Sequence, residues 1–355
     1  MTCDGCGDGN APAVCGKCRL ARYCTRECQV LAWKTGHKNE CEALRAASAL
    51  ATAALEEIGI VLTELRKCPL SAAHNSWHGE AVCCCAKACA QLCHLAENKA
   101  HRLVIATSGG INEVLLAMRR HLSSFVIQEA ASRALYNLSF SPENKYIIRK
   151  AGGVEILLTA LRTHPANAGV QDHACGAICS LAAGNGRNLA AVATAMGNGG
   201  VIEALDAMRN QKDNVWIQLK ACGILWILTS VEEKGVEIVD GGGILLIIHA
   251  MLAFPGHAAM QEQASGVLCH LANNGAFETA IAEAGGIACV LRAMSTHPLH
   301  AGVQEQGCGA LFNISGSILN RGTLAQAGIS ELLSAMRTHT DHSGVQEQAC
   351  WSCCK

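Results

Sequence analysis

The sequence predicts an all-α protein, a right-handed solenoid of stacked helices that follows a small metal-stabilised domain. Three observations lead to this prediction. Apolar residues recur with the period of an α-helix. The same pattern returns about every 43 residues over most of the chain. Seven cysteines and one histidine lie within the first 41 residues, at the spacings of metal ligands.

The composition favours closely packed helices. Half of the 355 residues are apolar, whereas aromatic residues make up 4% and charged residues 16%. Such a chain can bury a large core through small side chains. The formal net charge is −1, so there is no basic excess to attract a phosphate backbone, which argues against nucleic acid as a partner.

No segment has the properties of a secretory signal or of a membrane span. The first ten residues lack both a basic and an apolar region. The most apolar run, Ile244 to Leu252, is about half of the ~20 residues that a spanning helix needs. We therefore expect an intracellular protein, cytoplasmic and/or nuclear, whose 22 cysteines stay reduced and serve as metal ligands or as small core residues.

The first domain, expected over residues 1–45, has the ligands for two tetrahedral metal sites. Its cysteines come in closely spaced pairs, and a histidine and a cysteine end the set with the spacing H-x3-C. Closed sites of Cys and His are typical of structural zinc, and one such ion contributes roughly 10–16 kcal/mol to the folding of small fingers. A redox Cys-x-x-Cys motif is the alternative, but it needs a βαβ context, which is absent. The eight ligands are Cys3, Cys6, Cys15, Cys18, Cys24, Cys28, His37 and Cys41.

Residues 3–41 resemble the MYND zinc finger. The eight ligands match, as do Tyr23, Gln29, Trp33 and Lys38 at their places beside them. The resemblance implies two Zn²⁺ ions with interleaved ligands. Zinc 1 is held by Cys3, Cys6, Cys24 and Cys28, and zinc 2 by Cys15, Cys18, His37 and Cys41.

The resemblance also implies that the finger binds short proline-containing peptides, with Gln29 and Trp33 as contacts. Two alternatives remain open. Trp33 can instead pack over a zinc site as part of a miniature core, and Gln29 can be a polar residue of the last helix of the finger.

Three kinds of residue mark the repeat in a single register. Successive glutamines are 43, 47, 43, 43 and 42 residues apart, and a glycine column and a Met/Leu column keep closely matching steps. The extra residues of the 47-residue unit lie before Gly200, where we expect a surface bulge or a longer short helix. The three columns are Gln128, Gln171, Gln218, Gln261, Gln304 and Gln346; Gly110, Gly153, Gly200, Gly243, Gly286 and Gly328; and Met118, Leu161, Met208, Met251, Met294 and Met336.

Each unit is expected to contain three helices. A short helical piece such as SPENKYIIRKA is followed by a helix that starts at a Gly-Gly pair and stops near His-Pro, and then by the Gln-containing helix. The pattern resembles the armadillo repeat over residues 46–355. We expect a partial first unit at 46–69, about six units to residue 342, and a last unit broken off at 355.

The resemblance implies that the third helices line a groove that binds a protein partner. In armadillo proteins Trp and Asn columns hold an extended peptide, but here the Trp column is mostly glycine, so the chain departs from import receptors. We also consider that this glycine floor lets a wide partner approach. The groove candidates are His94, Arg133, Asn137, Ser180, His270 and Asn313.

Two recurring columns have simple structural interpretations. Cysteines that repeat at one helical position are expected to be small buried residues, although a metal or redox cluster at Cys83, Cys84, Cys85, Cys89 and Cys93 is a second possibility. Histidines that repeat at a helix end are expected to cap it, with a pH-sensing stripe as the alternative. The first column contains Cys89, Cys175, Cys222, Cys308 and Cys350, and the second His121, His164, His297 and His339.

The motifs of common enzyme classes are absent from the sequence. We therefore expect a non-catalytic adaptor or scaffold that binds proteins or peptides and no small-molecule substrate. The alternative is a nuclear transcriptional co-regulator recruited through the finger. A basic localisation cluster would favour that alternative, and no stretch rich in Lys and Arg is visible.

Overall fold

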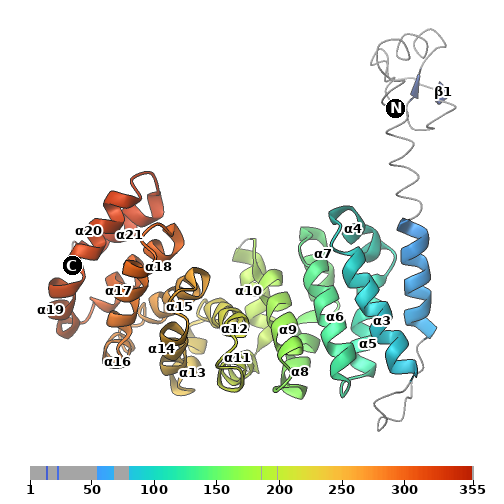
Figure 1. Cartoon of the computed structure of the whole chain (residues 1–355), viewed down its shortest axis with the longest axis horizontal. Helices are drawn as coiled ribbons and strands as arrows, with labels where there is room; N and C mark the ends of the chain where they lie inside the picture. The colour runs from blue at the N-terminus through green and yellow to red at the C-terminus, as the bar shows by residue number, and fades with distance from the viewer. Residues whose placement is uncertain are drawn as a thin grey trace. The chain divides into compact units, whose positions relative to one another are not determined.

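The computed structural model describes residues 13–14, 22–23, 54–67, 80–184, 186–197 and 199–353 (Figure 1). The chain divides into two compact units, Met1–Glu64 and Leu65–Lys355. The domain boundary predicted at residue 45 lies outside the described residues and stays a prediction.

The first unit contains a short antiparallel pair of strands. Strand β1 (Ala13–Val14) pairs with β2 (Arg22–Tyr23), so that Ala13 lies opposite Tyr23 and Val14 opposite Arg22. The eight predicted zinc ligands, Gln29 and Trp33 lie outside the described residues. A helix follows at residues 54–67.

The second unit is a stack of helices in groups of three (Figure 1). Helix α3 (Glu80–Leu95) precedes six groups, each made of a first, a second and a third helix. This arrangement confirms the predicted all-α solenoid. The groups are α4 Lys99–Thr107, α5 Gly110–Arg120 and α6 Phe125–Leu138; α7 Pro142–Lys150, α8 Gly153–Thr163 and α9 Ala168–Ala182; α10 Gly186–Met196, α11 Gly199–Asn210 and α12 Val215–Leu228; α13 Glu232–Asp240, α14 Gly243–Ala253 and α15 Ala258–Leu271; α16 Glu278–Glu283, α17 Gly286–Thr296 and α18 Ala301–Ile314; and α19 Ile318–Ala327, α20 Ile329–Thr338 and α21 Ser343–Cys353.

The Gly-Gly pairs form the corner between the first and second helices. Gly242 has a φ of 77°, in the left-handed region that favours glycine. Gly243, the first residue of α14, lies so close to α13 that an added Cβ would be 2.7 Å from the carbonyl oxygen of Ile238. The first glycine therefore turns the chain, and the second allows the two helices to pack closely.

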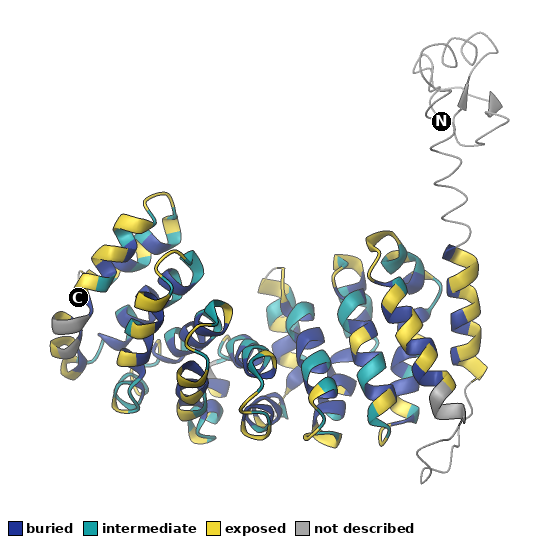
Figure 2. Ribbon diagram, viewed as in Figure 1, coloured by how far each residue is buried: buried dark blue, intermediate teal, exposed yellow. Residues whose placement is uncertain are grey.

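The core lies between equivalent helices of successive groups. Each third helix packs against the next, from α3 against α6 to α18 against α21, and the second helices stack in the same way. The residues turned toward neighbouring helices are buried, and the exposed ones face outward (Figure 2). Helix α10 has 11 residues where α7 and α13 have nine each, so part of the extra length of this unit extends the short helix, as expected.

Within the described ranges, no individual helix has the length and apolar character to cross a membrane. The bent pair Glu233–Asp240 and Gly243–Ala253 passes the same criterion when its two parts are taken together. Much of α14 is buried in the stack, as expected for a core helix.

Candidate protein-binding groove

The six predicted groove residues lie on α3 or on the third helices of the groups, on a surface that we call the third-helix face. His94 is on α3, Arg133 and Asn137 are on α6, Ser180 is on α9, His270 is on α15 and Asn313 is on α18. His94 and Arg133 are exposed, and the other four are half-buried.

The two asparagines bind the preceding third helix. Asn137 Nδ2 donates a hydrogen bond to the Cys93 carbonyl oxygen, 3.0 Å away, and Asn313 Nδ2 donates to that of Cys269, 2.9 Å away. Both distances are those of ordinary N–H···O bonds. The side chains are therefore held in place across the boundary between units, and their contact with a partner stays a prediction.

His270 is held in its neutral form. Trp226 Nε1 donates to His270 Nε2, 3.2 Å away, and the two rings meet edge to face. A protonated imidazole carries a hydrogen on both nitrogens and cannot accept this bond. Burial lowers the pKa of His270, because desolvation disfavours the charged ring.

The glycine column is covered by side chains of neighbouring units, so the hypothesis of an open glycine floor is wrong. A Cβ added at Gly266 would be 3.1 Å from the Trp226 ring. At Gly309 it would be 3.0 Å from Cys269 Sγ. Glycine at these positions makes room for the chain's own side chains across each interface.

The covering residues form a column whose full composition the sequence analysis missed. Reading the same position in each successive unit would have revealed the alternation of small and large side chains. The column is Cys93, Tyr136, Cys179, Trp226, Cys269 and Phe312.

A second contact between units, also not anticipated from the sequence, joins α9 and α12 on the third-helix face. Lys220 Nζ lies 2.5 Å from Asp172 Oδ1 and 5.4 Å from the centroid of the Tyr136 ring. Both charged side chains are mostly buried. Lys220 and Asp172 therefore neutralise each other on the third-helix face.

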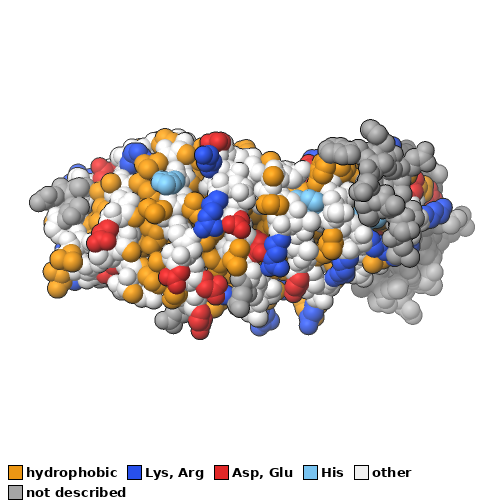
Figure 3. Space-filling view, turned by 90° about the horizontal axis from the view of Figure 1, so that it is seen from below, with side chains coloured by type: hydrophobic (Ala, Val, Ile, Leu, Met, Phe, Trp, Pro, Cys, Tyr) orange, Lys and Arg blue, Asp and Glu red, His pale blue; other side chains and the backbone are white. Residues whose placement is uncertain are grey.

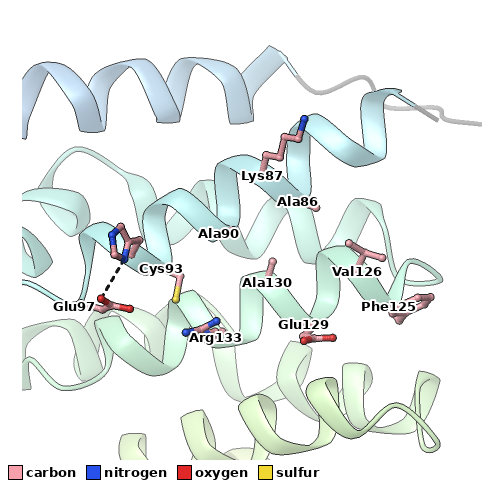
Figure 4. A pocket seen from close by; sticks show the side chains of 11 residues that line it. Ala86, Lys87, Ala90, Cys93, Glu97, Phe125, Val126, Glu129, Ala130 and Arg133 are labelled. Atoms are coloured by element: carbon pink, nitrogen blue, oxygen red, sulfur yellow. Dashed lines mark ion pairs between the residues drawn. The ribbon is translucent and has the colours of Figure 1, made fainter. Parts of the chain in front are cut away.

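Two hollows adjoin the third-helix face. The larger, of about 550 Å³, lies between α3 and α6 and is lined by Arg133 and His94 among others (Figure 4). The smaller, of about 410 Å³, is lined by polar residues such as Ser230, Asn273 and Asn274, together with His270. The structure thus places three of the six groove candidates beside a hollow.

The repeated cysteines are core residues, as predicted for Cys89, Cys175, Cys222 and Cys308, while Cys350 is exposed. Burial raises the pKa of Cys222 to about 12 and that of Cys308 to about 12, so both remain thiols. Across the described ranges, no group of three or more His, Cys, Asp or Glu residues could hold a metal ion.

The repeated histidines occupy C-cap positions, as predicted for a capping role. Their rings also reach the preceding unit. His164 Nε2 lies 2.7 Å from the Leu122 carbonyl oxygen, and His297 Nε2 lies 2.8 Å from that of Pro255. The column therefore connects successive corners of the stack.

Charged side chains of both signs are interspersed on the face shown in Figure 3, among hydrophobic ones. Neither sign dominates that view. Parts of this surface therefore differ through local ion pairs and hollows, and not through a large region of positive or negative charge.

Two family models match parts of the chain. The MYND finger model matches residues 3–41, and the armadillo/beta-catenin-like repeat model matches residues 141–183. The armadillo match spans α7, α8 and the whole of α9. No curated protein matches the chain.

Solved structures share the fold of the helical array. A crystal structure of an engineered protein has a TM-score of 0.57 and 21% identity, covering 74% of this chain and 99% of that one. A structure from work on a conserved phosphorylation switch that controls the interaction between cadherin and beta-catenin has a TM-score of 0.66 and 17% identity. That match covers 90% of this chain and 58% of the other, so this chain spans little more than half of its length.

These identities support a shared fold only, whereas the MYND match rests on the sequence itself. MYND fingers bind zinc, and MYND and armadillo domains are commonly protein-interaction modules. The chain combines a MYND finger at residues 3–41 with an armadillo-type α-solenoid that contains an armadillo repeat at residues 141–183.

Proposed function

We propose that the chain is a non-catalytic adaptor with two binding sites. The finger binds short proline-containing peptides, and the third-helix face binds a protein partner. The observation that carries this proposal is the combination of a MYND finger and an armadillo-type solenoid in one chain. If both sites bind one complex, the second event becomes intramolecular and the overall affinity rises.

Two zinc ions are proposed for the finger. The donor set of seven thiolates and one imidazole suits closed structural zinc sites. The match to the MYND finger model covers all eight of these residues.

The third-helix face has the mixed character of a protein-binding surface. Trp226 and Tyr136 are half-buried on it, and Val126, near the start of α6, is exposed. Aromatic residues and arginine are enriched at protein interfaces. Half-buried side chains held by hydrogen bonds, such as Asn137, are ordered before a partner arrives, which lowers the entropy cost of binding.

We propose that the protein acts inside the cell, cytoplasmic and/or nuclear. The cysteines of the described ranges are free thiols rather than disulfides. Free thiols are typical of reducing compartments.

A peptide-library selection with the full-length chain tests the finger. The intact protein is expected to enrich proline-containing peptides, and Trp33→Ala is expected to lose them while two zinc ions remain in native mass spectrometry. Trp216→Ala is the matched control, because Trp216 is an exposed tryptophan of the array, and it should keep the enrichment.

Retention of the proline-containing peptides by Trp33→Ala would contradict a recognition role for the finger. One zinc ion per chain in the intact protein would contradict the two-site arrangement.

A further inference from the structure

The hollow between α3 and α6 exists because the side chain at one repeated position of the third helices is shorter on α6 than at other interfaces. At three other interfaces a long polar side chain from this position reaches back to a glycine of the preceding unit. Lys220 Nζ would be 3.2 Å from a Cβ added at Gly176, and Gln348 Oε1 would be 3.0 Å from one added at Gly309. Gln263 reaches back to Gly223 in the same way.

Between α3 and α6 the equivalent residue is Ala130, which faces Ala90 in the preceding helix. A methyl group cannot reach across the gap that a Lys or Gln side chain spans elsewhere. The result is a hollow of about 550 Å³ (Figure 4), a size typical of ligand pockets.

The walls of the hollow are mostly apolar at one end. Ala86, Ala90 and Ala130 line it together with Val126, a residue that is 45% exposed. Phe125 adds an aromatic wall at the start of α6. An apolar side chain that enters this space would bury its surface against carbon atoms.

Two cations border the same hollow without a carboxylate partner. Lys87 and Arg133 are both exposed, and neither forms an ion pair within the ranges that the structure describes. Arg133 projects from α6 beside Cys93, and Lys87 projects from α3 (Figure 4).

The two carboxylates of the hollow already have partners. Glu97 Oε2 lies 3.1 Å from His94 Nδ1. The carboxylate of Glu129 lies against Gly169, at the first turn of α9. The positive end of the helix dipole favours a carboxylate there. Lys87 and Arg133 therefore remain available to a carboxylate of a partner, in contrast to Lys220, which Asp172 neutralises.

We propose that the hollow between α3 and α6 binds an acidic peptide segment, in which an apolar side chain enters the space over Ala90 and Ala130 and a neighbouring Asp or Glu pairs with Arg133 or Lys87. This inference rests on the proposed adaptor function and names the kind of partner for its third-helix face. A guanidinium pairs well with a carboxylate because it can donate two parallel hydrogen bonds.

Fluorescence anisotropy with labelled synthetic peptides and the full-length chain tests the proposal. The first probe contains Leu next to Asp in a Gly/Ser background, the second replaces Asp with Lys, and the third replaces Leu with Ser. The first probe should bind most tightly, and raising the salt concentration should weaken it, since exposed charge pairs are screened.

Two variants change the hollow in different ways. Ala130→Gln introduces a glutamine, the residue type that two other units have at the equivalent position, as Gln263 and Gln348. The fold should therefore accommodate the new side chain, which fills the hollow. Arg133→Gln removes one cation. Ala130→Gln should weaken binding of the first probe by about tenfold, the effect of losing one buried side chain. Arg133→Gln should weaken it by up to about fivefold, the effect of losing one exposed ion pair.

Lys212→Gln is the matched control, because it removes one exposed cation between α11 and α12 and should leave the affinity unchanged. Circular dichroism of every variant should match that of the intact protein.

The proposal is overturned if the first probe fails to bind, if the Lys-containing probe binds equally well, or if Ala130→Gln and Arg133→Gln bind like Lys212→Gln. If the acidic probe fails while the finger still enriches proline-containing peptides, this inference is wrong but the finger's part of the proposed function stands. Loss of both would contradict the adaptor function itself.

Discussion

The side-chain amide of Gln261 donates a hydrogen bond to the main-chain carbonyl oxygen of Met251, 3.0 Å away. Its Nε2 also donates to the carbonyl oxygen of Phe254, 2.9 Å away. Gln261 and Met251 belong to the glutamine column and the Met/Leu column of the repeat. The same pair of bonds recurs in all six described groups. The glutamine thus joins the third helix of each unit to the last turn of its second helix, whose carbonyls lack helical partners.

Gln261→Met should lower the free energy of unfolding by about 2 kcal/mol or more. Methionine fills a similar volume but leaves two carbonyls of a mostly buried turn without their donor, and an unsatisfied buried group costs about 1–3 kcal/mol. Urea denaturation of the full-length chain, followed by circular dichroism, measures the effect. Gln263→Met is the matched control on the same helix and should shift the transition little, and equal shifts for the two variants would contradict this role for Gln261.

Gly243→Ala should destabilise the array by roughly 1–3 kcal/mol, the usual range for overpacking. The added methyl group would be 2.7 Å from the Ile238 carbonyl oxygen and 2.6 Å from Ile238 Cγ2, so α13 and α14 must move apart. Thermal melting is the measurement. Gly256→Ala, with no atom within 4 Å of the added Cβ, should have the same melting temperature as the unchanged protein. One melting temperature for all three proteins would contradict the close approach of α13 and α14 at Gly243.

Ser265→Ala should raise the free energy of unfolding by about 1 kcal/mol, because a buried hydroxyl without a partner loses its hydration and gains nothing. Ser265 Oγ is buried and has no hydrogen-bond partner in the described ranges. The equivalent residues in neighbouring units are Cys222 and Cys308, which pack there without a hydroxyl. Chemical denaturation tests this expectation against Ser295→Ala on the exposed surface, and a lower stability for Ser265→Ala would show that its hydroxyl has a role.

Acidification should weaken the array through His270. Burial lowers its pKa in the folded state, so the unfolded chain binds the proton more tightly. The free energy of unfolding is therefore highest above the ordinary histidine pKa of about 6.5, and it decreases as the pH falls through the lower folded-state pKa.

His270→Asn, which introduces the residue found at Asn137 and Asn313, should reduce this pH dependence. Urea titrations at a series of pH values, with tryptophan fluorescence reporting on Trp226, provide the measurement. An equal slope of stability against pH in both proteins would show that His270 is not responsible.

The helices were predictable because their determinants are local. Apolar period, Gly-Gly pairs and His-Pro stops lie within a few residues of the structure that they specify, so α7, α8 and α9 could be read from one unit and transferred to the others. The recurrence of Gln171 with Leu161, ten residues earlier, likewise reflects a bond within one unit.

The contacts between units could not be read in this way. The glycine column suggested an open floor, whereas Trp226 covers Gly266 from the preceding helix. Asp172 and Lys220 are 48 residues apart, and nothing in either local sequence indicates that their side chains meet.

The sequence by itself determined the helical units and their order, because these depend on spacing and on hydrogen bonds within one unit. Only the tertiary structure decided which parts of the third-helix face are closed and which are open. Stacking brings together side chains from adjacent units. The hollow between α3 and α6 remains because the side chain of Ala130 is short where other units have Gln or Lys.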